Sequence, residues 1–165
     1  MPFKRDLLVI LLLMGCVGCD QFTKDVAQRY LAFESPRSWF HDTIRLEYAE
    51  NTGAFLSLGG GLSDEWRIIL FQVFPALWLV GLAVFLFMTK QMPMGVAIAW
   101  SLVLAGGLGN LVDRIVHDGR VIDFLNLGIG SLRTGIFNVA DLCITIGVAL
   151  LVFHAFQPLR TSARE

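Results

Sequence analysis

The sequence predicts an α-helical integral membrane protein with four transmembrane helices and a small β-sheet and loop region on the outer membrane face. Its 165 residues are 55% hydrophobic and only 16% charged, a composition that departs from that of soluble globular domains. Four apolar stretches approach the length of about 20 residues needed to cross hydrocarbon. We place them at about residues 6–26, 67–88, 94–113 and 136–157, and we expect residues 1–165 to form a single membrane domain.

The first span is apolar over residues 7–22 except for Asp20 and Gln21. It crosses the bilayer if the helix continues past Lys24, whose alkyl stem can carry the ammonium group toward the membrane boundary. Asp20 and Lys24 are also spaced i, i+4 on a helix. An ion pair that stabilises the end of this span therefore accounts for both residues without any function.

The second span contains no charged residue over positions 68–88. Ser63 precedes it as a candidate N-cap, and Pro75 predicts a kink within it. Because only residues 89–93 separate this span from the third, we expect the two helices to form an antiparallel hairpin.

The third and fourth spans differ in where their special residues lie. The third ends in a glycine-rich stretch, residues 105–109, which favours close approach of a neighbouring backbone. The fourth carries Asn138 and Asp141 in its first turns and His154 near its far end, and Pro158 then stops the helix. We expect His154 to be an interfacial histidine with no catalytic role.

The two longer connections predict a small sheet at the membrane surface. Residues 44–48 alternate apolar with polar side chains, and residues 121–127 form a second β-prone run. Asn51 and Gly53 follow the first of these runs, and on their own they indicate only a turn.

Four crossings bring distant polar residues to the same side of the membrane. The C-terminal ends of spans one and three and the N-terminal end of span four must face one compartment, whatever the orientation. The residues that this argument brings together are Asp20, Asn51, Asn110, Asp113, Arg114, Asp123, Asn138 and Asp141.

The density of basic residues predicts the orientation. The short segments on the opposite side carry Lys4, Arg5, Lys90, Arg160 and Arg164. Because short cytoplasmic segments are enriched in Lys and Arg, we expect both termini to be cytoplasmic and the polar cluster to face outward.

Asp123 and Asp141 are the strongest candidates for chemistry. A carboxylate near hydrocarbon is costly unless it is paired or neutralised, and pairing with Arg114 or Arg120 could hardly account for both acids. Two neighbouring carboxylates share a proton, so one can act as general base on a water while the other acts as general acid. The dipole of the fourth helix favours ionised Asp141, whereas the apolar surroundings of Asp123 favour its protonated form.

Asn110, Asp113 and Arg114 share one face of the third span. This spacing permits an Asp–Arg pair that anchors the helix, and equally an arginine that braces a catalytic carboxylate. The sequence does not choose between these two interpretations.

Two other catalytic chemistries have weaker support. Ser57 with Lys24 or His117 could form a serine hydrolase site, but no G-x-S-x-G or comparable signature accompanies it. Asp113, His117 and Asp123 could in principle hold a metal, but their spacing matches no common ligand pattern. We therefore predict no metal site.

Net charge and the placement of polar residues argue against a nucleic-acid-binding protein and against a transporter. The net charge is −1 and no Lys/Arg run is present, so we expect no nucleic-acid partner. A transporter would need polar residues near mid-membrane, and these are scarce. Cys16, Cys19 and Cys143 all lie in apolar stretches, and we interpret them as buried thiols that fill small core spaces.

Five short motifs occur in order along the chain: Asp20-Gln21-x-x-Lys24, Asn51-Thr52-Gly53-Ala54, Gly107-x-Gly109-Asn110-x-x-Asp113-Arg114, Val121-Ile122-Asp123-Phe124 and Phe137-Asn138-Val139-Ala140-Asp141. Together they resemble the lipoprotein signal peptidases, also called signal peptidase II. The resemblance covers nearly the whole chain. It departs from the family at Phe55-Leu56-Ser57, where Ala-Phe-Ser is frequent, and we expect this departure to bear on loop packing and substrate preference rather than on the two aspartates.

The resemblance implies an aspartic endopeptidase of the bacterial plasma membrane with its active site near the outer face. Such an enzyme removes the signal peptide of a diacylglyceryl-modified prolipoprotein by cutting before the lipidated cysteine, and it needs no cofactor. By the same resemblance, Asp123 and Asp141 are the catalytic pair. The residues that would bind substrate or shape the site are Asp20, Lys24, Asn51, Gly53, Asn110, Arg114, Asn138 and Ala140.

One alternative belongs to a different class of protein. Leu13-Met14-Gly15-Cys16 follows Lys4-Arg5 and an apolar run, so the chain could itself be a lipoprotein with a lipobox. Cleavage before Cys16 would destroy the first span and the arrangement that brings the polar residues together.

Overall fold

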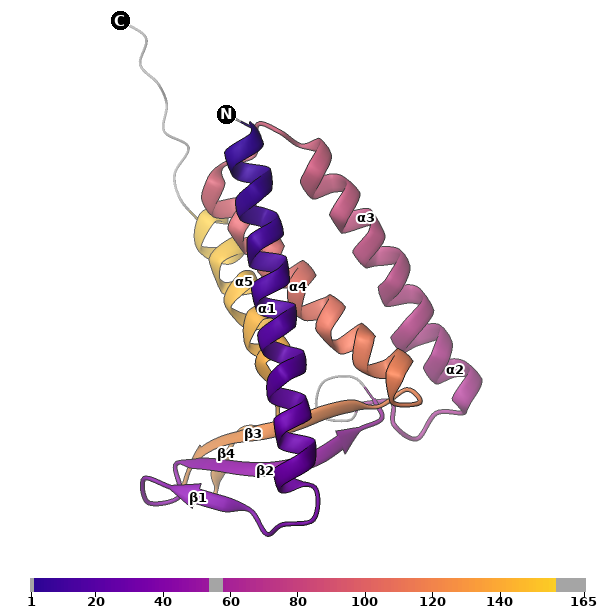
Figure 1. Ribbon diagram of the computed structural model, residues 1–165, viewed down its shortest axis with the longest axis vertical. Helices are drawn as coiled ribbons and strands as arrows, with labels where there is room; N and C mark the ends of the chain where they lie inside the picture. Colours follow the sequence, from indigo (N-terminus) through magenta and orange to yellow (C-terminus); the bar gives the residue numbers. More distant parts are fainter. Residues whose placement is uncertain (1, 54–57, 157–165) are drawn as a thin grey trace, which may run out of the picture.

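The computed structural model describes residues 2–53 and 58–156. Ser57, Pro158 and the Phe55-Leu56-Ser57 departure lie outside the described residues. Helices make up most of the described chain, and a small sheet caps one end of the helical bundle (Figure 1). The helices are α1 (Pro2–Leu31), α2 (Asp64–Ile68), η2 (Ile69–Val73), α3 (Phe74–Met88), α4 (Met94–Val116) and α5 (Val139–Ala155).

Three helical segments of the described chain have the length and apolar composition to cross a membrane. They are Phe3–Leu31, Asp64–Met88 (the continuous α2, η2 and α3) and Met94–Val116. The fourth predicted span corresponds to α5, Val139–Ala155, which is apolar but shorter. These helices and the small sheet confirm the predicted class of a multi-pass helical membrane protein.

The second membrane-crossing segment, for which Pro75 predicts a kink, contains a helical irregularity close to that proline. The π-helical turn η2, Ile69–Val73, ends two residues before Pro75, the second residue of α3. Proline has no N–H to donate and its ring crowds the preceding turn, so a widened turn relieves the clash. The prediction for Ser63 is wrong in one respect: it occupies the N-cap position of α2 but makes no capping hydrogen bond, because its hydroxyl interacts with the Glu65 carboxylate.

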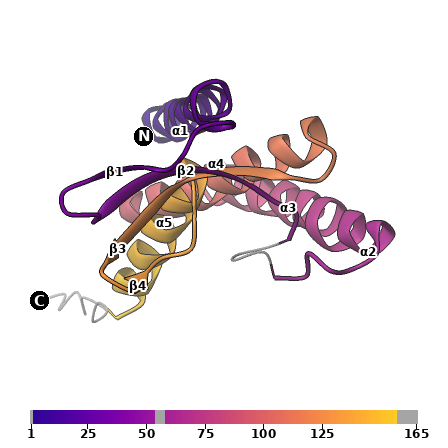
Figure 2. The same ribbon diagram turned by 90° about the horizontal axis from the view of Figure 1, so that it is seen from below.

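The sheet is antiparallel, with strand order β1 (Arg37–Trp39), β2 (Ile44–Asn51), β3 (Val121–Ile129) and β4 (Leu132–Arg133). The two predicted strands are β2 and β3. Their register changes between the pairs Leu46↔Leu125 and Ala49↔Asp123, so β2 has one extra residue there. Such a bulge bends the strand and changes where the following side chains point. In Figure 2, α1 lies along one side of the strands and α5 along the other.

Small residues let α4 lie against α5 and α1, as the glycine-rich end of the third span predicts. A Cβ on Gly106 would collide with the carbonyl oxygen of Ala140 in α5. A Cβ on Gly147 in α5 would lie 2.7 Å from the carbonyl oxygen of Ala99. The two backbones are therefore in contact at both ends of this interface.

The arrangement of helix ends agrees with the argument from crossings. The C-terminal ends of α1 and α4 and the N-terminal end of α5 all lie at the sheet end of the bundle (Figure 1). His154 lies at the opposite end, where its ring approaches Gly95 and Nδ1 is 2.7 Å from the carbonyl oxygen of Leu150. It is therefore far from the polar cluster, as predicted.

The cysteines correct one prediction. All three are free, but only Cys143 is buried; Cys16 is half-buried and Cys19 is exposed on α1. Cys19 therefore fills no core space, because it lies on the outer face of its helix.

Candidate active site

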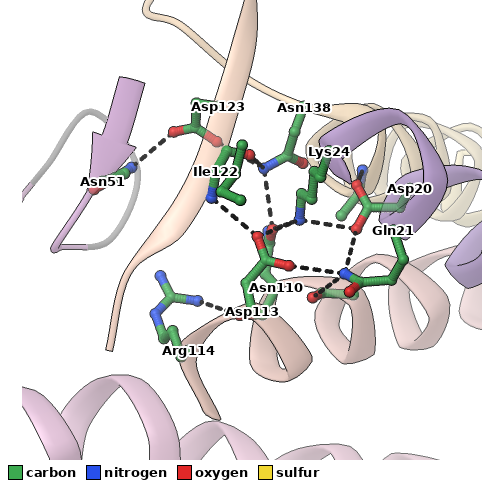
Figure 3. Close-up of polar contacts among 12 residues, drawn as sticks. Asp20, Gln21, Lys24, Asn51, Asn110, Asp113, Arg114, Ile122, Asp123 and Asn138 are labelled. Carbon is green, nitrogen blue, oxygen red and sulfur yellow. Dashed lines mark hydrogen bonds and ion pairs between the residues drawn. The ribbon is translucent and has the colours of Figure 1, made fainter. Parts of the chain in front are cut away.

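Asp123 is a buried carboxylate at the end of the sheet nearest the helices. It lies in β3 and is only 3% exposed. Its Oδ1 accepts a hydrogen bond of 2.7 Å from Nδ2 of Asn138, and its Oδ2 accepts one of 3.2 Å from Nδ2 of Asn51 (Figure 3). Asn51 is the last residue of β2, so the strand pairing brings it to Asp123.

Asp141 is held in the first turn of α5 by a reciprocal cap. The Asn138 side chain accepts the Asp141 N–H at 2.9 Å, and the Asp141 carboxylate accepts the Asn138 N–H at 3.3 Å. This capping box follows from the Asn-x-x-Asp sequence at the helix start. The other carboxylate oxygen, Oδ1, accepts 2.8 Å from Nδ2 of Asn110 in α4. Asn138 thus contacts both aspartates.

The electrostatic environment raises the pKa of Asp123 to about 6. Burial is the largest cause, and the negative charge of nearby Asp141 adds to it. The hydrogen bonds donated by Asn51 and Asn138 oppose the shift because they favour the ionised form. Asp123 therefore holds a proton at a pH where an exposed aspartate would not.

Lys24 is buried beneath this pair, which corrects the expectation that its ammonium group reaches the membrane boundary. It is 2% exposed and forms ion pairs with Asp20 at 2.8 Å and Asp113 at 3.0 Å. The predicted Asp20–Lys24 pair is confirmed. Lys24 also donates 3.1 Å to Oδ1 of Asn110. Two buried carboxylates and an amide oxygen surround the ammonium group, so it has no need of solvent.

Asp20 joins α1 to the start of α5. Its Oδ1 accepts the Ala140 backbone N–H at 2.8 Å, one of the free donors of the first helical turn. Gly109 of α4 leaves the space that this contact needs, because a Cβ there would lie 2.6 Å from Asp20 Oδ2. Gln21, which the sequence placed in the first motif but not among the candidate site residues, donates 2.8 Å to Oδ1 of Asp113.

Arg114 forms no ion pair with Asp113, Asp123 or Asp141 among the described residues, but its charge lies close enough to interact electrostatically with all three carboxylates. Its guanidinium donates to the carbonyl oxygens of Gly53 at 2.8 Å and Asn110 at 3.2 Å, and it lies over the ring of Phe71. Asp113 pairs with Lys24 instead, so no Asp113–Arg114 ion pair forms among the described residues. Arg114 therefore ties the turn after β2 to α4.

Two further residues considered in the sequence, Gly53 and Arg120, contact neighbours other than the two aspartates. The Gly53 N–H donates 3.0 Å to Oδ1 of Asn51, which closes the turn after β2. Arg120 pairs with Glu50 at 2.6 Å rather than with either candidate aspartate. Within residues 2–53 and 58–156, no three His, Cys, Asp or Glu side chains are grouped to hold a metal ion.

Asp141 opens onto an apolar pocket of about 240 Å³. The pocket lies between the first two turns of α5 and the segment that precedes them, and it is lined by Thr134, Gly135, Ile136, Phe137, Asp141, Leu142 and Thr145. An extended apolar segment entering this pocket would meet a carboxylate.

The fold and this site define a multi-pass membrane protein with two hydrogen-bonded aspartates at the end of its helical bundle. A sequence model of the family described as signal peptidase (SPase) II matches residues 12–157. The chain belongs to the signal peptidase II family, a family of membrane peptidases.

Individual relatives agree over most of the chain. The lipoprotein signal peptidase of Sphingopyxis alaskensis is 44% identical over 139 residues, covering 82% of this chain and 78% of that protein. That of Borrelia hermsii is 31% identical over 161 residues, covering 93% and 94%. A solved structure described as a bacterial membrane enzyme at 2.3 Å resolution superposes with a TM-score of 0.80 at 27% identity, covering 96% of this chain and 93% of that one.

Proposed function

We propose that this protein is an aspartic endopeptidase that cleaves diacylglyceryl-modified prolipoproteins immediately before the lipidated cysteine. The single observation that carries the mechanism is the pair Asp123 and Asp141, held by one asparagine, with the pKa of Asp123 raised to about 6. The substrate class is supported by the family and by relatives named lipoprotein signal peptidase.

In the proposed mechanism one proton circulates between the two carboxyl groups. Asp141, at a helix N-terminus and hydrogen-bonded to Asn110, is the ionised base that takes a proton from water as the water oxygen attacks the scissile carbonyl carbon. Asp123 gives its proton to the carbonyl oxygen, which forms a tetrahedral diol. On collapse, Asp141 protonates the leaving nitrogen and a diol hydroxyl returns a proton to Asp123.

The other predicted site residues hold the two carboxylates, or the elements that carry them, in position. Asn51, Asn110 and Asn138 donate to the carboxylates. Lys24 donates to Asn110 and so fixes its side chain. Asp20 fixes the first turn of α5 by accepting the Ala140 N–H, and Arg114 fixes Gly53 by donating to its carbonyl oxygen. The apolar pocket beside Asp141 suits the apolar end of a signal peptide, and the substrate's two acyl chains keep it in the bilayer.

The proposal includes an orientation and a single domain over residues 1–165. With both termini in the cytoplasm of a bacterial cell, the sheet end of the bundle lies at the outer face of the plasma membrane. Lys4, Arg5 and Lys90 at the opposite end favour this direction. Attachment of an impermeant thiol reagent to a cysteine introduced at Asp118, with Cys16, Cys19 and Cys143 replaced by serine, would test it in intact spheroplasts. Labelling is expected from outside.

The decisive experiment replaces Asp123 and Asp141 singly with Asn and measures cleavage of a diacylglyceryl prolipoprotein in lipid. We expect each variant to lose activity by at least about a thousandfold, because neither amide can exchange the proton. Asp25→Asn, on the exposed side of α1, is the matched control and should retain activity. Turnover near wild type in either site variant would contradict the mechanism, whereas a fully active Ser57→Ala variant would exclude the serine alternative.

The mass of the N-terminal peptide distinguishes the proposed peptidase from the lipoprotein alternative. Cys16 lies in the middle of the continuous helix α1, so cleavage before it would remove half of that helix. We expect an uncleaved N-terminus, and a diacylglyceryl group on Cys16 at the new N-terminus would support the rival.

A further inference from the structure

A second apolar pocket, of about 360 Å³, lies between the last turns of α1 and the sheet. Phe22, Val26 and Tyr30 line it from α1, Arg37 and Trp39 from β1, and Phe124 from β3. Its volume is in the range of ligand pockets, roughly 300–1,000 Å³. Nothing in the proposed peptidase mechanism uses it.

This pocket belongs to the face of the sheet away from the two aspartates. Asp123 and Phe124 are neighbours in β3, and successive side chains of a strand point to opposite faces. Asp123 contacts Asn51 and Asn138, whereas Phe124 packs on Ala27 and Leu31 of α1. The pocket is therefore separated from the carboxylates by the strand itself.

The depth of the pocket is set by the length of α1. The ion pair between Asp6 and Lys90 marks the opposite end of the bundle, and a hydrocarbon core spans about 20 helical residues. Counted from Asp6, the second boundary falls near Val26. Phe22 then lies on the hydrocarbon side, while Tyr30 and Trp39 lie at the headgroup level, where such aromatic residues are enriched.

Arg37 gives the pocket a charged rim. The Arg29 side chain pairs with Asp25, and Arg45 pairs with Asp42, but the Arg37 guanidinium forms no hydrogen bond or ion pair with another residue of the described chain. A free cation at headgroup depth beside an apolar pocket is complementary to an amphiphile with an acidic head.

We propose that this pocket binds one anionic phospholipid of the membrane. One acyl chain lies in the pocket against Phe22 and Val26, and the phosphate lies against Arg37. Such a lipid would fasten β1 to the end of α1 and hold the sheet, with β3 in it, on the bundle. The proposal does not rest on the proposed peptidase activity.

The test uses the full-length protein in nanodiscs that contain equal mole fractions of phosphatidylglycerol and phosphatidylcholine, with retained lipid counted by native mass spectrometry. We expect the wild type to retain one phosphatidylglycerol in preference to phosphatidylcholine. Arg37→Gln should reduce that preference about fivefold, the effect of one basic residue near a membrane surface. Val26→Trp should fill the pocket and abolish retention of either lipid there.

Matched controls separate this site from general lipid contact. Arg29→Gln removes a basic residue that already has a partner, and Val148→Trp enlarges an exposed position on α5, so both should retain lipid as the wild type does. An unchanged preference in Arg37→Gln, or an equal loss in the controls, would overturn the proposal. Displacement of the retained lipid by a diacylglyceryl peptide would also overturn it, because the pocket would then belong to the substrate.

Discussion

The side-chain amide of Asn138 donates a 2.7 Å hydrogen bond to Oδ1 of Asp123. Its direction is not free, because the amide oxygen of the same side chain accepts the Asp141 N–H and so caps α5. The amide nitrogen must therefore face β3. Asn138 therefore fixes both members of the proposed catalytic pair: Asp141 in the first turn of α5 and Asp123 in β3.

Asn138→Ser separates these two functions. Serine is as good an N-cap as asparagine, so the cap of α5 should survive, and the variant should lose only about 1–3 kcal/mol of stability because the buried amide no longer donates to Asp123, Asn110 and the Ile122 carbonyl. Its shorter hydroxyl cannot cap the helix and also reach Asp123, so cleavage should fall by about a hundredfold, as when a positioned donor is removed. Thermal unfolding and initial rates measured on the same preparation check both parts. Activity that falls no further than the folded fraction does would contradict the proposed positioning of Asp123 by Asn138.

The pH profile follows from the pKa of Asp123, raised to about 6. The proposed reaction needs Asp123 protonated, so kcat/KM should fall as the pH rises through about 6. The Asn51 amide donates to the carboxylate and favours its ionised form. Asn51→Ala should therefore raise the pKa and move this limb to higher pH, even though the maximal rate falls. A limb that stays in place, or moves to lower pH, would contradict the assignment to Asp123.

The membrane helices and the meeting of their polar ends could be predicted from the sequence, because both depend on hydropathy and on the number of crossings. Alternation of apolar residues was sufficient to find β2 and β3. The short strands β1 and β4 have only three and two residues, too few for any periodic signal. Their existence depends on pairing with the longer strands.

Side-chain partners could not be predicted in the same way. Lys24, Asp113 and Arg114 lie at spacings that allow several ion pairs, and the sequence left open whether Arg114 pairs with Asp113 or braces a catalytic carboxylate. The structure pairs Asp113 with Lys24 because α1 and α4 cross at this level, which places the ammonium group between two carboxylates. Spacing within one helix carries no information about the rotation of another helix against it.

Two ion pairs on α1 have the same i, i+4 spacing and opposite burial. Lys24 and Asp20 are 2% and 1% exposed, whereas Arg29 and Asp25 are 69% and 49% exposed. Lys24→Met leaves Asp20 and Asp113 buried without their cation and should cost about 3–5 kcal/mol of stability. Arg29→Met should change stability little, because an exposed pair is screened by solvent. Thermal unfolding in one detergent compares them, and similar melting temperatures would refute the buried network.

Gly109 and Gly18 offer a matched pair, one at a crowded helix contact and one at an open position. A Cβ on Gly109 would lie 2.6 Å from Asp20 Oδ2 and 3.2 Å from the Ala140 Cβ, whereas a Cβ on Gly18 would meet nothing within 4 Å. Gly109→Ala should therefore push Asp20 away from the Ala140 N–H and cost about 1–3 kcal/mol. Gly18→Ala should be neutral or stabilise α1 by up to about 1 kcal/mol, since alanine favours a helix.

The cleavage activity of Gly109→Ala and Gly18→Ala tests whether the packing of Asp20 also positions the proposed catalytic pair. The Asp20 contact holds the first turn of α5, which also carries Asp141, so Gly109→Ala should lower cleavage by about tenfold or more at temperatures where the protein stays folded. Gly18→Ala should cleave as the wild type does. If Gly109→Ala unfolds at a lower temperature but cleaves normally when folded, Asp20 supports the fold without positioning the catalytic pair.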